Sequence, residues 1–418
     1  MSQLFRFLCL VCLSVFFAGC DSEEVEITVF HTNDLHSHMH APKDAAFALG
    51  GVARLSTLLN ELRSKEDGVV LTLDAGDFSE GTWHYSLDTG ANMIKILDQM
   101  GYDATVVGNH DYLSGPDRMI ETIKEADVDM PVLVANLDLS QYEKVESFRE
   151  QFPKSVIIEK QGLKIGIIGL TVNDIAYSTY LDPAIVTNPV TEAQVQADLI
   201  RDQVDLLFIL SHNSFDVNKQ IAKSTLGVHA VISGHSHKKL SQAVFVENAG
   251  RQVPVVETGC WGSFLGKLQL KYNIKTKQVS FVDYDLNPVF STYEKDPIIQ
   301  SMVEAEDQKL NEFYGSDVYE VVAHSDIRLT HSDSHKASLG DVVTKSYRHL
   351  LDVDLAIELL PLTGVNVAPG DLTVKDLHDV MPHVFNYETQ KEWTIKVWNA
   401  KAADIGFIVN VFYTAAQL

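Results

Sequence analysis

Five short clusters of histidine, aspartate and asparagine stand directly behind apolar, strand-like runs of the sequence. They occupy residues 31–36, 74–77, 108–111, 211–213 and 233–237. Imidazole and carboxylate groups suit Zn, Mn, Fe or Ni, and the absence of cysteine from the clusters argues against a thiolate site. Because ligands bind beyond the carboxyl ends of strands in open α/β sheets, we expect the five clusters to converge on one site.

The number of candidate ligands indicates more than one ion. Together the five clusters supply seven protein ligands. One catalytic ion with an open position takes fewer protein ligands, whereas two ions that share a carboxylate account for the count. Two ions about 3.5–4 Å apart can clamp a phosphate ester and activate a bridging water for in-line attack. The residues therefore predict two divalent metal ions (Zn, Mn or similar) and hydrolysis of a phosphate ester.

Each cluster alone also has a structural interpretation. Residues 34–36 or 109–111 would fit turns, in which Asn and Asp are favoured for local reasons. His212 alone would fit a buried, hydrogen-bonded histidine, and residues 235–237 would fit a solvated loop. The recurrence of such clusters in order, behind successive strands, favours the metal site over these alternatives.

The elements that must position these clusters alternate between strands and helices. Predicted strands cover residues 25–30, 69–73, 104–107, 132–135, 164–170, 205–210 and 229–232, and predicted helices cover 51–64, 90–100, 117–126, 191–203 and 218–225. This alternation predicts an α/β domain. Further strands at 244–246, 253–257, 266–273 and 279–286 are joined by hairpin-sized segments and are expected to be antiparallel.

Length and charge limit the classes of protein and partner. A chain of 418 residues suggests two domains, and 45% hydrophobic with 22% charged residues is ordinary for a globular protein. The formal net charge of −24 argues against a nucleic acid polymer as partner, because a phosphate backbone needs a basic surface. An acidic enzyme with an anionic substrate must supply positive charge locally, and bound metal ions do this.

Residues 1–20 predict a bacterial lipoprotein signal peptide. Arg6 precedes an apolar run over residues 7–17 that is too short to span a bilayer comfortably, and Ala18 and Gly19 stand before Cys20. Lipid on Cys20 would anchor the protein in the bacterial cell envelope. An ordinary signal peptide with an incidental cysteine is the alternative. Once the signal is removed, Cys260 alone remains beside Cys20, so no intramolecular disulfide is expected.

In order, the clusters resemble the motifs of calcineurin-like metallophosphoesterases. The segment 31–36, followed by Gly50-Gly51-x-Ala53-Arg54, is similar to the 5′-nucleotidase branch of that family. The resemblance covers about residues 25–290 and implies a four-layer α-β-β-α sandwich. It implies that one ion is held by Asp34, His36, Asp77 and His237, and the other by Asp77, Asn109, His212 and His235. It also implies that His110 is catalytic, stabilising the phosphoryl transition state or assisting the leaving oxygen.

Two departures from the branch stand out. An aspartate often follows the family's Asn-His pair by three residues and orients the histidine, but here this position is Leu113. The C-terminal part matches the branch around residues 370–377, yet no arginine follows Arg348 and the chain stops earlier than such a domain normally does. Phe385, Tyr387 and Trp393 remain candidates for stacking on a base, although aromatic residues are more often part of a core.

These observations predict four segments. They are a signal peptide (1–20), a catalytic domain (25–290), a helical linker (291–317) and a smaller, truncated α+β domain (318–418). The predicted function is two-metal hydrolysis of small phosphate esters, foremost nucleoside 5′-monophosphates, outside the cytoplasm. Alternatives are the same chemistry on a 2′,3′-cyclic nucleotide, a nucleotide sugar or a sulfur conjugate, or a non-catalytic lipoprotein that binds a ligand.

Overall fold

The computed structural model describes residues 24–42, 49–315, 317–330, 338–356 and 366–380, together with two short strands at 385–386 and 391–392. The predicted signal peptide with Cys20 lies outside these residues, as do Tyr387, Trp393 and the side chain of Phe385. Within the described part of the chain, no helix combines the length and apolar character needed to cross a membrane.

The first sheet has six strands in the order β14-β13-β1-β2-β3-β4. Their bounds are β1 (Glu24–Thr32), β2 (Val69–Asp74), β3 (Ala104–Val106), β4 (Val132–Leu133), β13 (Phe264–Asn273) and β14 (Gln278–Pro288). β1 to β4 run parallel, whereas β13 and β14 join β1 as an antiparallel hairpin. The parallel strands therefore end at one edge, where the predicted clusters begin.

The second sheet also has six strands, in the order β11-β12-β10-β9-β7-β6. Their bounds are β6 (Ser155–Lys160), β7 (Leu163–Leu170), β9 (Leu206–His212), β10 (Ala230–Gly234), β11 (Val244–Asn248) and β12 (Arg251–Val256). β7, β9, β10 and β12 are parallel, and the edge strands β6 and β11 are antiparallel to their neighbours. β6 was not predicted, because its apolar run is confined to residues 156–158 and none of its residues is fully buried.

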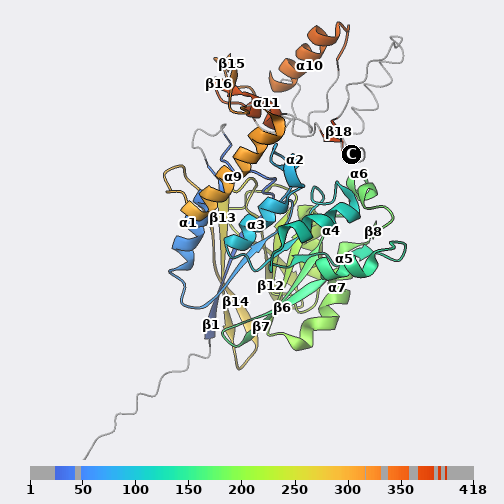
Figure 1. Cartoon of the computed structure of the whole chain (residues 1–418). Helices are drawn as coiled ribbons and strands as arrows, with labels where there is room; N and C mark the ends of the chain where they lie inside the picture. The colour runs from blue at the N-terminus through green and yellow to red at the C-terminus, as the bar shows by residue number, and fades with distance from the viewer. Residues whose placement is uncertain are drawn as a thin grey trace, which may run out of the picture.

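The two sheets pack face to face, and helices cover both outer faces (Figure 1). Residues such as Leu71, Ile167 and Phe208 fill the layer between the sheets. The first sheet is covered by α1 (Val52–Arg63), α3 (Ala91–Gln99), α4 (Gly115–Ala126) and α5 (Val145–Gln151), and the second by α7 (Pro189–Ile200) and α8 (Phe215–Ser224). The predicted four-layer α-β-β-α sandwich is therefore confirmed. Strands covered on both faces explain the continuous apolar runs in the sequence.

Short elements complete this body at the loops and edges. They are α2 (Tyr85–Asp88), α6 (Ile175–Ser178), the 3₁₀ turns η1 (Thr179–Leu181) and η2 (Arg201–Gln203), and the two-stranded pair β5 (Leu137–Asp138) and β8 (Ile185–Val186).

Helix α9 (Pro297–Tyr314) falls in the segment predicted as a linker, and it packs along α1 and α3. Its N-cap Asp296 accepts hydrogen bonds from the backbone of Ile298 and Ile299, and Ser56 of α1 donates to the same carboxylate. Ile299 and Val303 are buried in the core that α1 and α3 share. The helix is therefore part of the packed body, and its C-terminal end leads to the remaining elements (Figure 1).

The last described elements form a smaller α+β group beyond α9. They are β15 (Val321–Ser325), α10 (Ser338–Leu351), β16 (Gly370–Thr373), α11 (Val374–Val380), β17 (Phe385–Asn386) and β18 (Lys391–Glu392). A small apolar core includes Leu339, Val367 and Leu372. Trp83 stacks on His378 of α11, with 4.4 Å between ring centroids, and ties this group to the catalytic body.

Candidate metal centre

The predicted clusters follow five strands that belong to two different sheets. β1, β2 and β3 carry three clusters in the first sheet, and β9 and β10 carry two in the second. The loops are joined by backbone hydrogen bonds: the amide of Asp34 donates to the carbonyl of Gly76, and the amide of His36 to the carbonyl of Asp77. The site therefore bridges the two sheets at their facing carboxyl edges.

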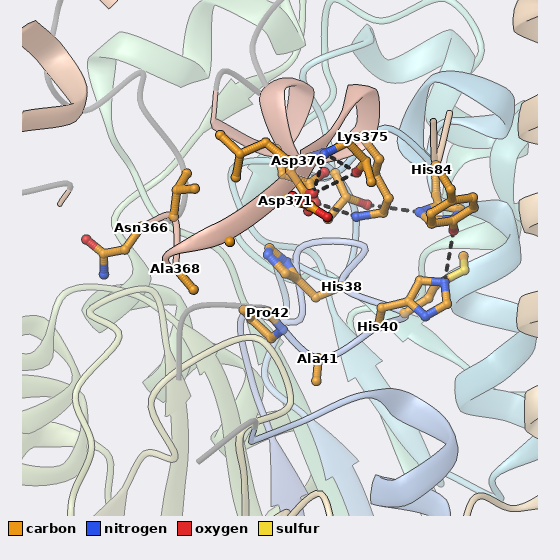
Figure 2. Close-up of a pocket in the computed structure, with 18 of the residues that line it drawn as sticks. His38, His40, Ala41, Pro42, His84, Asn366, Ala368, Asp371, Lys375 and Asp376 are labelled. Atoms are coloured by element: carbon orange, nitrogen blue, oxygen red, sulfur yellow. Dashed lines mark hydrogen bonds and ion pairs between the residues drawn. The ribbon is translucent and has the colours of Figure 1, made fainter. Parts of the chain in front are cut away.

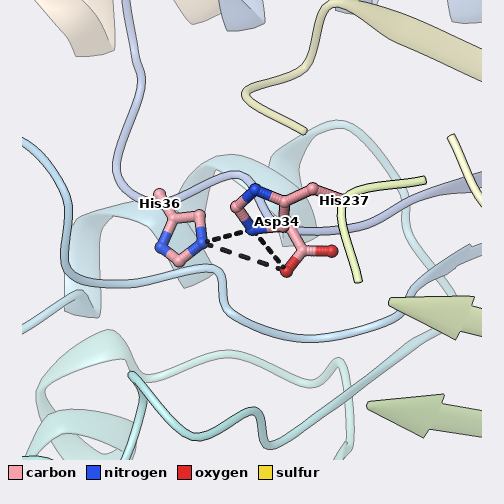
Figure 3. Close-up of side chains that lie close together, drawn as sticks. All are labelled: Asp34, His36 and His237. Atoms are coloured by element: carbon pink, nitrogen blue, oxygen red, sulfur yellow. Dashed lines mark hydrogen bonds and ion pairs between the residues drawn. The ribbon is translucent and has the colours of Figure 1, made fainter. Parts of the chain in front are cut away.

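Asp34, His36 and His237 form the first group of candidate ligands (Figure 3). The Nε2 atoms of His36 and His237 are 3.2 Å apart, and His237 Nε2 lies 3.2 Å from Asp34 Oδ1. His36 Nε2 is 3.9 Å from the same oxygen. The three atoms thus surround one small volume, as ligands of a single ion do.

Asp77, Asn109, His212 and His235 form the second group. His212 Nε2 lies 3.0 Å from Asp77 Oδ2, and His235 Nδ1 lies 2.9 Å from Asn109 Oδ1. Asp77 Oδ2 is also 3.7 Å from His36 Nε2 of the first group. Asp77 therefore stands between the two groups, in the position that a shared carboxylate needs.

The hydrogen bonds of two histidines fit a bound cation. The Nδ1 of His36 donates to the carbonyl of Glu80, and the Nδ1 of His212 donates to the carbonyl of Ala75. In the neutral ring, each Nε2 then carries a lone pair that points into the site. His212 Nε2 is buried and lies against Asp77 Oδ2, at a distance that a shared cation would bridge. Converging lone pairs and carboxylates repel one another unless a cation lies between them, so this donor set fits divalent metal ions.

The charges in the site lead to the same conclusion. Burial raises the pKa of Asp77, but His212 and His110 outweigh burial and hold it well below its usual value. Burial also opposes the charged form of His212, yet Asp77 raises the pKa of that ring to about 10. The buried carboxylates therefore demand nearby positive charge, which metal ions would supply.

The backbone at the candidate ligands is held in an unusual conformation. Asp34, His36, Asp77, His235 and His237 have positive φ angles of 53°, 48°, 52°, 78° and 50°. Side chains other than glycine rarely adopt this region, and such strain is concentrated at functional sites. A Cβ on Gly108 would lie 2.1 Å from Asp77 Oδ1, so only glycine lets the two loops approach this closely.

His110, the predicted catalytic residue, lies beside both groups but pairs with a residue that the sequence analysis missed. Its Nδ1 hydrogen-bonds to the carboxylate of Glu80, and its ring packs edge-on against His36, with 4.8 Å between centroids. Burial lowers the pKa of His110, but Asp77 and Glu80 outweigh burial and raise it to about 9. Glu80 therefore occupies the orienting role that Leu113 cannot fill. Its place three residues after Asp77, in the same loop, was the available signal.

Asp111 and Leu113, which follow His110 in the chain, have other contacts. Asp111 accepts hydrogen bonds from the amides of Gly108, Asp77 and Ser79. It therefore holds two metal-site loops together instead of facing the histidine ring. Leu113 is buried and packs against aromatic side chains, including Tyr85.

Glu257, which follows β12, supports the loop that carries two candidate ligands. It accepts hydrogen bonds from the hydroxyl of Ser236 and the amide of Lys238, on either side of His237. The sequence analysis missed this residue because its strand end carries no histidine or second acid that would mark a site.

The sequence matches the model of the calcineurin-like phosphoesterases over residues 27–239, just over half of the chain, and the chain belongs to this family. Mouse 5′-nucleotidase is 27% identical over 343 residues, which cover 76% of this chain and 58% of that protein. The trifunctional nucleotide phosphoesterase protein of Bacillus subtilis is 26% identical over 397 residues, 85% of this chain and 26% of that protein. The chain is a member of the 5′-nucleotidase branch, as its motifs predicted.

Solved structures share the fold. The 5′-nucleotidase precursor of Thermus thermophilus superposes with a TM-score of 0.76 at 24% identity, covering 85% of this chain and 74% of that chain. The NAD nucleotidase of Haemophilus influenzae gives 0.63 at 18% identity, covering 86% and 75%. The family to which the chain belongs is metal-dependent, so divalent ions are implied for the centre described above.

Proposed function

We propose that this protein hydrolyses small phosphate esters with two divalent metal ions, and that nucleoside 5′-monophosphates are its main substrates. One observation carries the proposal. Asp77 lies between two groups of ligand atoms that five separate strand ends bring together. Two ions sharing a carboxylate form the arrangement that clamps and activates a phosphate ester.

Each residue then has a defined task. Asp34, His36 and His237 would hold one ion, Asn109, His212 and His235 would hold the other, and Asp77 would contact both. Bound there, the ions supply Lewis-acid activation of the phosphoryl group.

His110 is assigned to the transition state. Its ring, held by Glu80, can present a protonated Nε2 to developing negative charge on a phosphoryl or leaving oxygen. The edge-on contact with His36 keeps the ring beside the ligand groups rather than turned to solvent.

A cavity of about 420 Å³ supports a place for the organic part of the substrate (Figure 2). It lies between the loop after β1 and the segment from residue 366 to α11, and it is lined by Arg54, Lys295 and Lys375 among others. Asp371, Asp376 and Asp379 also line the cavity, and Lys375 pairs with Asp379, so the metal ions rather than the lining would supply the charge that attracts an anionic ester. Nucleotide substrates also agree with the 5′-nucleotidases among the relatives, although the chain spans 58% of the mouse protein.

The test is hydrolysis by purified protein of AMP, GMP, CMP, UMP, cyclic nucleotides and p-nitrophenyl phosphate, with Mn, Zn, Mg, Co or Ni added. We expect metal-dependent release of phosphate from the monophosphates and the generic ester. Discrimination among the four bases should be shallow, because Tyr319 is the one aromatic ring, apart from histidines, in the described lining of the cavity. A preference for one base of 10²-fold or more, about 2.7 kcal/mol, would reveal a base pocket and contradict this part. Absence of activity with every metal would contradict the function itself.

We also propose that the protein is exported and held in the cell envelope by lipid on Cys20. The support is the segment Ala18-Gly19-Cys20 behind the apolar run. This location would let the enzyme act on esters outside the cytoplasm.

A further inference from the structure

A second, separate cluster of metal-capable side chains lies at one end of the cavity. It consists of His40 in the loop after β1, His84 at the N-cap of α2, and Asp307 in α9. His84 Nε2 is 2.9 Å from Asp307 Oδ1, and His40 Nε2 is 3.0 Å from both carboxylate oxygens. Figure 2 shows the two rings next to each other. None of these residues belongs to the two ligand groups described above.

The hydrogen-bond partners of His84 bear on which of its two ring nitrogens carries the proton. The hydroxyl of Thr82 donates its only proton to the carbonyl of Ser37, at 2.8 Å. Its oxygen can then only accept from His84 Nδ1, which lies 3.4 Å away. In the tautomer that donates from Nδ1 to Thr82, the lone pair of a neutral His84 lies on Nε2 and faces the carboxylate, where a cation would bridge the two atoms.

The spacing matches that of ligands around an ion. Tetrahedral zinc with bonds of about 2.0 Å holds its ligand atoms about 3.3 Å apart. The separations in this cluster, 2.9 and 3.0 Å, are similar to the 3.0 and 3.2 Å found in the main metal centre. The ring of His40 is about one-third exposed, which leaves a route for an ion and a position for water.

We propose that His40, His84 and Asp307 bind a third divalent transition-metal ion of the zinc class. Two imidazoles and one carboxylate are a donor set that zinc accepts with water in the fourth position. Tyr319 donates to Asp307 Oδ1 at 2.6 Å and lies 3.4 Å from His40 Nε2, so it supports the carboxylate at the cluster itself. The ion would fasten the loop after β1, the start of α2 and helix α9 to one point. Its task is structural, because it shares no ligand with the main metal centre.

The experiment counts ions per chain. Protein stripped with a chelator is reloaded with Zn²⁺, freed of excess metal and analysed by mass spectrometry. Three equivalents are expected in the parent and two in His40→Ala and in Asp307→Asn. His349→Ala, which removes an exposed histidine of α10, is the matched control and should keep three. Asp77→Asn should lose metal from the main centre and retain the third ion.

A thermal measurement provides a second readout that does not depend on activity. In the Asp77→Asn background, added Zn²⁺ should still raise Tm, because an ion held only by the folded state stabilises it. Adding His40→Ala to this background should abolish the rise, while adding His349→Ala should not. Two equivalents in the parent, or an unchanged count in both His40→Ala and Asp307→Asn, would overturn the proposal. Asp307 would then serve only as a hydrogen-bond acceptor for the two rings.

Discussion

The carboxylate of Glu80 hydrogen-bonds to Nδ1 of His110 beside the metal centre, and Glu80 is buried while His110 is half-buried. The contact fixes the plane of the His110 ring beside the ligand groups. Glu80 is itself tied to the centre, because its backbone carbonyl accepts from Nδ1 of His36. One residue of the loop after β2 therefore orients both a candidate ligand and the candidate catalytic histidine.

Glu80→Gln should lower kcat by about 10–100-fold while metal content stays at the parental value. Glutamine retains the size and a hydrogen bond but removes the charge that favours a protonated His110. The measurement is steady-state kinetics with metal analysis on the same samples. Glu61→Gln, an exposed glutamate on α1, serves as control and should behave like the parent. An unchanged kcat in Glu80→Gln would show that the pair does not orient His110.

His110→Ala should reduce kcat on the order of 10²-fold or more, with metal occupancy unchanged. The reason is that His110 belongs to neither of the two ligand groups but lies next to them, so its loss should affect the reaction and not metal binding. Kinetics and metal analysis together check the expectation. Loss of an ion in this variant would make His110 a ligand, which its distance to Asp77 and His36 also permits.

Asp77→Asn should abolish hydrolysis and lower the metal content by more than one equivalent, because Asp77 stands between both ligand groups. His237→Ala should remove chiefly one ion, since His237 contacts only the first group. Metal analysis of the two variants side by side tests the assignment. Retention of both ions of the main centre by Asp77→Asn would exclude the shared carboxylate.

Chelation should lower Tm of the parent, and re-addition of metal should restore it. The buried lone pairs and carboxylates of the centre repel one another without cations, and metal binding energy adds to folding energy. Thermal unfolding followed by circular dichroism gives the shift. The Asp77→Asn variant should respond less than the parent, and an equal response in both would place the stabilising ions elsewhere.

Cys20→Ser should yield an unprocessed or released protein, whereas the parent should partition into detergent. Multiple acyl chains are needed for stable anchoring, because one chain binds membranes only marginally. Phase separation and N-terminal mass analysis of the mature protein make the comparison. A mature parent that begins at a residue other than Cys20 would refute the lipid anchor.

Much of this protein follows from its sequence because the information is local. Continuous apolar runs such as 206–210, within the predicted strand 205–210, mark strands covered on both faces, and β9 is found at Leu206–His212. Clusters such as residues 108–111 follow those runs directly. The chemistry at each strand end, the alternation of strands and helices, and the family were therefore predictable from residue types and spacing.

Tertiary structure decided how the strands are divided and which side chains meet. Hydrophobic pattern cannot assign parallel strands to one sheet or another, so β9 and β10 could be placed opposite β1 to β3 only by packing. The fold likewise brings together side chains that lie far apart in the sequence. Glu80 meets His110 in this way, and His84 meets Asp307, each pair within 3 Å. Spacing along a sequence reports local periodicity, whereas such contacts are fixed by the close packing of elements that the sequence separates.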